Sequence, residues 1–201
     1  MIHTREVVSP SARAETWLVA RAAFFIAYGS ALWVSAETHA AAPVVAPPLA
    51  PFERRASDLA PEDQRVHRAL QEGIVEAERR RSATGRWPSA EDLAREAIPP
   101  FAPDPLDRAR FSWSIVTSGA VVNYLGVPRA DPARASFMVI IVEPDPSAVP
   151  DPAAPIDETH HRLADGTMIQ VTVWMGPPPA TTDRAVKVPA PGQQKIVGSP
   201  R

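Results

Sequence analysis

Residues 111–127 read FSWSIVTSGAVVNYLGV and predict a β-hairpin. Aromatic and aliphatic residues alternate with serine over the first half of this stretch, which is the period of a strand with one buried face. A turn at Ser118 and Gly119 then separates that strand from a second one over residues 120–127. The hairpin places an antiparallel sheet at the centre of the fold.

Two more stretches predict further strands. Residues 137–142, FMVIIV, are apolar without a break, as in a strand that is covered on both faces. Residues 160–163 and 167–175 flank Asp165 and Gly166, a typical hairpin turn. We therefore expect an antiparallel sheet of four or five strands.

The residues before the first hairpin predict the main helix. Pro61 suits its first turn, and Gly85 is a stop signal at its end. Val66, Leu70 and Ile74 form an apolar stripe at four-residue spacing, which is typical of a helix with one face on a core. The fold class is then α+β, with one main helix packed on the sheet.

A short second helix is expected before Pro99 and Pro100. Ser89 and Asp92 have the spacing of a capping box, in which each side chain hydrogen-bonds to the backbone of the other residue.

The N-terminal region has the features of a membrane anchor. Residues 17–36, WLVARAAFFIAYGSALWVSA, are long and apolar enough to cross a bilayer. Basic residues precede this run and none follows before Arg54, so the positive-inside rule keeps the N-terminus cytoplasmic and exports the rest. Residues 1–36 are thus a cytoplasmic N-terminus with a transmembrane helix. The alternatives are a cleaved signal peptide and a buried helix of a cytosolic domain.

Proline marks the other boundaries. The chain has 24 prolines in 201 residues. Residues 37–52 are rich in Ala and Pro and predict an extended linker. Residues 53–175 then form a periplasmic α+β domain, and residues 176–201, with six prolines, are expected to be a disordered tail.

Composition excludes several classes of function. The 21 Lys and Arg residues face 23 Asp and Glu residues, so the chain has no basic field for nucleic acid. Because there is no Cys, disulfides, thiol nucleophiles and cysteine zinc sites are excluded. The chain also lacks the common catalytic motifs, and we expect a protein that is not an enzyme.

Asp157, Glu158, His160 and His161 are the candidate metal ligands. Imidazoles and carboxylates together suit zinc. Adjacent histidines of a strand face opposite sides, so His160, on the same face as Glu158, could bind a metal with it, whereas His161 could not join them without a bend. The other interpretation is a solvated strand end. His67, next to the core-facing Val66, is expected to be a surface or flanking residue of the main helix.

Two resemblances add to these observations. GRWPSAEDLARE, residues 85–96, followed by IPPFAPDPLDRARFSWSI, residues 98–115, resembles the helix-to-sheet region of type II secretion pseudopilins. The similarity covers residues 62–127. It implies a pilin-like architecture and, as an alternative function, a structural subunit of a secretion or pilus assembly.

HTREVV at residues 3–8, the single span, the proline linker and DGTMIQVTVWMGP at residues 165–177 resemble an uncharacterised family of bacterial proteins. Members are membrane-anchored and encoded near zinc or manganese ABC transporters. The resemblance implies an accessory protein of metal-ion uptake at the inner membrane, with ABC transporter components as partners and zinc as the candidate metal.

Overall fold

A computed structural model describes residues 17, 19–30, 48–104, 109–145, 147, 155–179 and 183–198. The chain divides into two compact units, residues 1–47 and 48–201. In the first unit, residues 19–30 are helical. Residues 18 and 31–36 of the predicted span lie outside the described residues. Residues 1–16 and most of the predicted linker also lie outside them. Among the described residues, no helix is long and apolar enough to cross a membrane.

The second unit begins with a short strand and three helical segments. Strand β1 spans Glu53–Arg55, and a 3-10 turn follows at Ala56–Asp58. Helix α2 spans Pro61–Thr84 and α3 spans Ala90–Arg95. Both start signals are confirmed: Pro61 is the first residue of α2, and Ser89 with Asp92 forms the capping box of α3. Gly85 ends α2 in the left-handed conformation, which glycine adopts without strain.

The remaining elements are strands. They are β2 (Phe111–Ser118), β3 (Val121–Pro128), β4 (Ser136–Val142), β5 (His160–Arg162), β6 (Met168–Gly176) and β7 (Gln194–Val197). The predicted hairpin is β2 with β3, and its register runs from Phe111 opposite Pro128 to Ser118 opposite Val121.

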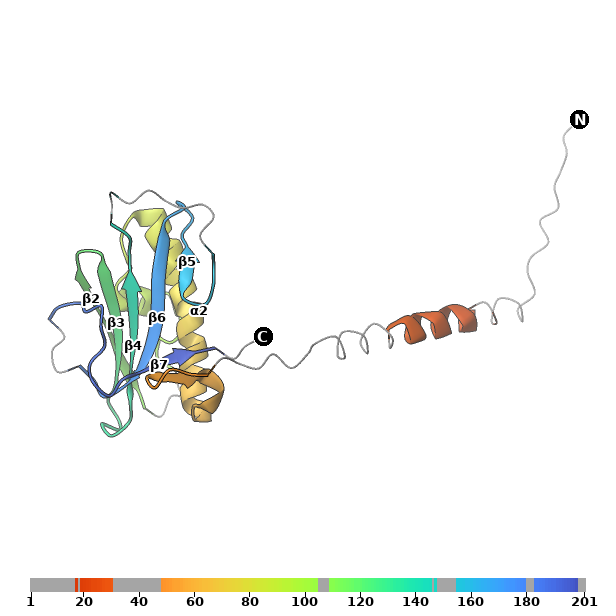
Figure 1. Cartoon of the computed structure of the whole chain (residues 1–201), viewed down its shortest axis with the longest axis horizontal. Helices are drawn as coiled ribbons and strands as arrows, with labels where there is room; N and C mark the ends of the chain where they lie inside the picture. The colour runs from red at the N-terminus through yellow and green to blue at the C-terminus, as the bar shows by residue number, and fades with distance from the viewer. Residues whose placement is uncertain are drawn as a thin grey trace, which may run out of the picture. The chain divides into compact units, whose positions relative to one another are not determined.

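The strands form one open sheet, and Figure 1 shows β2, β3, β4 and β6 side by side. Its order is β1-β7-β6-β4-β3-β2, and β5 pairs with β6 beside this path. β4 and β6 are central, as the unbroken apolar run of β4 predicts. All the pairs are antiparallel except β1 with β7, which is parallel.

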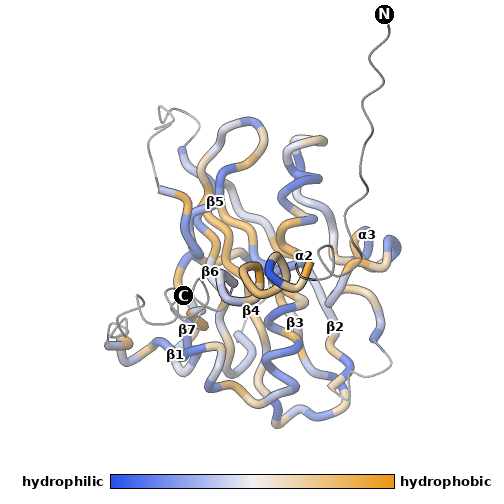
Figure 2. The backbone as a smooth tube through the Cα atoms, turned by 90° about the vertical axis from the view of Figure 1, so that its right-hand side faces the viewer, coloured by the Kyte–Doolittle hydropathy of each residue, from blue (hydrophilic) through white to orange (hydrophobic). Residues whose placement is uncertain are grey.

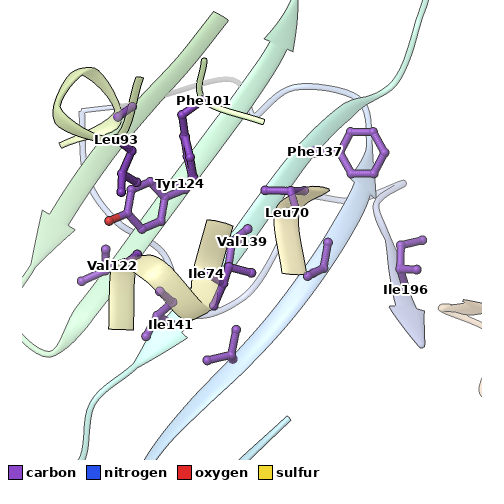
Figure 3. Packing of buried hydrophobic residues seen from close by; sticks show 14 of the residues in the cluster. Leu70, Ile74, Leu93, Phe101, Val122, Tyr124, Phe137, Val139, Ile141 and Ile196 are labelled. Atoms are coloured by element: carbon purple, nitrogen blue, oxygen red, sulfur yellow. The ribbon is translucent and has the colours of Figure 1, made fainter. Parts of the chain in front are cut away.

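The main core lies between the helices and one face of the sheet. Leu70 and Ile74 of α2 and Leu93 of α3 are buried against alternate residues of the central strands, among them Val139 and Ile141 (Figure 3). Figure 2 shows the hydrophobic residues concentrated in the strands, while α2 alternates between hydrophilic and hydrophobic residues. This alternation is the expected pattern of a helix with one face on a core.

The opposite face of the sheet is covered in part by the C-terminal strap, which we define as residues 183–193. Ala185 of the strap is buried in a second apolar cluster with residues of β3 and β4. Asn123, 4 % exposed, fixes the strap: its Nδ2 donates to the Val186 carbonyl at 3.0 Å, and the Val186 N–H donates to its Oδ1 at 2.7 Å. The Asn123 side chain thus makes the two hydrogen bonds with the Val186 backbone that a neighbouring β-strand would make.

Two predictions about the fold are wrong. The sheet has seven strands in the part of the chain that the structure describes, not four or five, and it is not purely antiparallel. The predicted disordered tail contains the strap and β7, because Ala185 and Ile196 find apolar partners on the two faces of the sheet. The domain therefore continues well beyond residue 175.

Candidate functional site

A groove lies beside β6, where the sheet is interrupted. β5 pairs with one end of the outer edge of β6, at Met168–Gln170, and β7 pairs with the other end, at Val173–Met175. Val171 and Thr172 lie between them, with α2 behind (Figure 1). The groove encloses a volume of about 660 Å³. Its walls are formed by Ala56, His67, Arg68, Gln71, Ile74, Val75, Glu158, Thr159, His161, Val171, Thr172, Val173, Lys195, Ile196 and Gly198.

His161 of β5 lies in the wall of the groove with both ring nitrogens close to oxygen atoms. Nδ1 is 2.6 Å from Oε1 of Glu78 on α2, and Nε2 is 3.3 Å from the carbonyl oxygen of Glu158. The hydrogen bond to Glu78 raises the pKa of His161 above its ordinary value. Both partners are largely buried, with 25 % of the His161 side chain and 14 % of the Glu78 side chain exposed.

Glu158 lines the groove together with Gly198. Its carboxylate accepts a hydrogen bond from the backbone N–H of Gly198, just after β7. A Cβ atom at position 198 would lie 2.8 Å from Oε1 of Glu158, so glycine allows this close approach. The contact joins the segment before β5 to the end of β7, two parts of the chain that pair with different stretches of β6.

His67 corrects the sequence-based prediction of a surface residue, since it is only 4 % exposed. The buried stripe of α2 runs through His67, Leu70, Ile74 and Ala77, so His67 rather than Val66 begins it. Burial lowers the pKa of His67. Within the described part of the chain its ring has no hydrogen-bond partner, and it faces the groove as one of its lining residues.

The four predicted metal ligands are divided into two separate pairs. His160 and Asp157 form an exposed pair away from the groove walls, with Nδ1 2.9 Å from Oδ2. Hydrogen bonds from His160 and from the backbone N–H of Thr159 lower the pKa of Asp157. Glu158 and His161 line the groove instead. In the part of the chain that the structure describes, no three His, Asp or Glu side chains are close enough together to hold a metal ion.

The three arginines at the end of α2 all form ion pairs with acidic side chains of the domain. Arg79 pairs with Glu76, Arg80 pairs with Glu76 and Glu96, and Arg81 pairs with Glu143.

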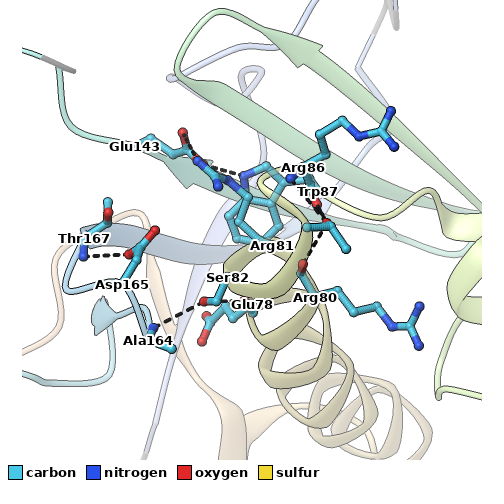
Figure 4. Close-up of polar contacts among 11 residues, drawn as sticks. Glu78, Arg80, Arg81, Ser82, Arg86, Trp87, Glu143, Ala164, Asp165 and Thr167 are labelled. Atoms are coloured by element: carbon cyan, nitrogen blue, oxygen red, sulfur yellow. Dashed lines mark hydrogen bonds and ion pairs between the residues drawn. The ribbon is translucent and has the colours of Figure 1, made fainter.

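The Arg81–Glu143 pair belongs to a polar cluster that fixes this end of α2 (Figure 4). Oε1 of Glu143 accepts from Arg81 Nε at 2.7 Å and from Trp87 Nε1 at 2.7 Å. Ser82 Oγ accepts from the backbone N–H of Ala164 in the turn between β5 and β6. The Ser82 contact holds the β5–β6 hairpin against α2, and the hairpin carries His161 to Glu78, whereas Glu143 joins α2 to the end of β4.

Sequence reasoning found His161 and Glu158 but missed Glu78, His67 and the groove itself. Glu78 is 83 residues away from His161, so no local spacing connects them. The signal that could have found His67 is its position three residues before Leu70 on the buried stripe of α2.

The fold and the groove define an α+β domain with an open, mostly antiparallel sheet and a groove of mixed polar and apolar lining beside β6. The chain belongs to DUF6162, a family of unknown function whose family model matches residues 54–193. The expectation of an uncharacterised family is confirmed, and the match extends through the strap. No curated protein and no solved structure matches the chain.

Proposed function

We propose that the chain is a non-enzymatic accessory protein of metal-ion uptake, anchored in the bacterial inner membrane, whose periplasmic domain accepts a divalent ion such as zinc in the groove. One observation carries the metal-binding part of the proposal: Nδ1 of His161 lies 2.6 Å from the Glu78 carboxylate. In zinc proteins, a histidine ligand usually donates its second N–H to a carboxylate, which fixes the ring for metal binding through the other nitrogen.

The groove offers further ligands of the right chemistry. His67 and Glu158 line it together with His161, which makes two imidazoles and one carboxylate. Neutral imidazole and carboxylate are zinc ligands. Because the three are not within coordinating reach of a common point in the structure, binding requires the side chains of His67 and Glu158 to turn toward Nε2 of His161. The metal then replaces the contact of Nε2 with the Glu158 carbonyl oxygen, and the Glu158 carboxylate leaves the Gly198 N–H.

Zinc affinity tests this proposal. The full chain in detergent is titrated with zinc against a chromophoric chelator. His161→Ala and His67→Ala should each abolish or strongly weaken binding, whereas His160→Ala should not, because His160 lies outside the groove walls. Equal losses for His160→Ala and His161→Ala, or no zinc binding by the unchanged chain, would contradict the proposal.

Glu78 provides a test of the orienting contact. Glu78→Gln should weaken zinc binding by roughly 10–100-fold, the usual effect of losing the carboxylate behind a histidine ligand. Glu76→Gln is the matched control on the same helix, since Glu76 pairs with Arg79 and Arg80 whereas Glu78 contacts His161. A similar affinity for both variants would show that the Glu78 contact is only structural.

The uptake role rests on the family resemblance, the membrane location rests also on the apolar run of residues 17–36, and both are tested in cells. Crosslinking of the full chain in membranes of zinc-starved cells should capture ABC transporter components. Capture of pilus or secretion components instead would overturn the accessory role.

A second candidate is a pilin-like structural subunit, and strand β2 favours it. β2 ends the sheet and pairs only with β3 among the described residues. Its sequence, FSWSIVTS, holds neither a charge nor a proline, the features that usually keep an end strand from pairing with another chain. Because the chain has no native cysteine, a single cysteine at Ser114 reports such pairing directly: a disulfide-linked dimer in membranes would support this function, and monomers alone would oppose it.

A further inference from the structure

We propose that a second cavity, separate from the groove, binds a small apolar carboxylate, an aromatic or aliphatic acid. This apolar pocket has a volume of about 340 Å³ and lies between the first turns of α2, the loop after α3 and the start of β2. Its walls are Glu62, Arg65, Val66, Ala69, Ala97, Pro99, Pro100, Ala102, Pro103, Asp104, Phe111, Trp113 and Arg134. None of these residues lines the groove, so the proposal stands independently of zinc binding.

The pocket is suited to an apolar body. Most of its lining side chains are aliphatic, proline or aromatic. The ring of Trp113 packs directly against Gly126, because a Cβ atom at that position would lie only 2.5–2.7 Å from three ring carbons. Trp113 also packs edge-on against Phe101 at 5.4 Å. The aromatic wall is therefore fixed by the fold and does not depend on a ligand to form it.

The size of the pocket limits the ligand to a small molecule. An apolar cavity of about 150 Å³ accepts benzene, so a cavity about twice that size accepts a fused two-ring body or a short alkyl chain. Pockets that bind small molecules start at about 300 Å³.

One charge at the pocket, that of Arg65, can pair with an anionic group on the ligand. Arg134 is neutralised by Glu62 and Asp63, each at 2.7 Å. Asp104 is also engaged in an interaction. Arg65 is the lining charge with no ion-pair or hydrogen-bond partner among the described residues, and it lies on the exposed side of α2. A carboxylate whose apolar body fills the pocket would find Arg65 as its counterion.

Two soluble probes with the same body separate the two parts of the proposal. Naphthalene-1-acetate and its neutral amide are titrated into the full chain in detergent by calorimetry, with protein-free micelles as the blank. The acid should bind more tightly than the amide. Arg65→Gln should weaken the acid about fivefold, as expected for one solvent-accessible charge contact, and leave the amide unchanged.

Two variants serve as controls. Arg68→Gln removes an exposed arginine three residues further along α2 that lines the groove instead, and it should change neither affinity. Ala69→Phe should fill the pocket and abolish binding of both probes, with circular dichroism confirming that the fold is retained. The proposal is overturned if neither probe binds, if Arg65→Gln and Arg68→Gln weaken the acid equally, or if binding survives in folded Ala69→Phe.

Discussion

Asn123 should fix the C-terminal strap to the sheet, and Asn123→Ala tests this directly. The substitution removes the two hydrogen bonds to Val186, at 2.7 and 3.0 Å. A hydrogen bond of this kind contributes roughly 1 kcal/mol net. The free energy of unfolding should therefore fall by about 2 kcal/mol, measured by urea denaturation followed through tryptophan fluorescence.

The same variant should also show where the stability is lost. The Val186 N–H donates to Asn123 Oδ1, so its hydrogen exchange should accelerate more than that of amides in β3 and β4. Gln170→Ala is the control, because Gln170 is an exposed residue of β6 and should change stability by less than about 0.5 kcal/mol. An Asn123→Ala variant as stable as the Gln170→Ala control, with unchanged Val186 exchange, would refute the account of the strap.

Two further predictions concern the core and the polar cluster. Leu70→Ala, at a fully buried position, should lower the free energy of unfolding in urea by about 2–5 kcal/mol. Val75→Ala on the same helix, where the residue is 62 % exposed, should lower it by less than about 1 kcal/mol. Similar losses for the two variants would contradict the position of the core. Glu143 is partly desolvated, which raises its pKa, but hydrogen bonds from Arg81 and Trp87 outweigh this and hold the pKa below its ordinary value of 4.5. A carboxyl with a lowered pKa stabilises the fold fully above its ordinary pKa, and this contribution is lost as the pH falls through the lowered pKa of the folded state. Trp87→Phe should thus destabilise by about 1–2 kcal/mol at pH 7 and by less at pH 3, and a deficit that does not shrink in acid would contradict the role of Glu143.

Local signals predicted the elements whose structure is locally determined. The β2–β3 hairpin follows from alternation and a glycine turn, and Gly119 adopts a φ of 57° there. The limits of α2 follow from Pro61 and Gly85. In each case the residues that decide the structure are neighbours in the chain.

β1 and β7 were missed because each is short and neither has a pattern of its own. Glu53–Arg55 reads ERR and Gln194–Val197 reads QKIV, and the two pair in parallel although about 140 residues separate them. The prolines around 176–201 were interpreted as disorder, but Ile196 is buried in the core and β7 pairs with β6 on one side and β1 on the other.

The candidate site shows the same limit. His161 and Glu158 were chosen for their chemistry, which the sequence displays. The partner of His161, the burial of His67 and the distance of His160 from the groove depend on how the β5–β6 hairpin docks on α2. That docking uses contacts such as Ala164 to Ser82, which no sequence motif records.

The most direct test of the proposed function is to locate zinc in crystals of the zinc-soaked protein by anomalous scattering at the zinc absorption edge. The account predicts a peak in the groove about 2.0–2.1 Å from Nε2 of His161, with Nδ1 still bonded to Glu78. A zinc peak beside His160 and Asp157, or crystals with no peak in the groove, would contradict it.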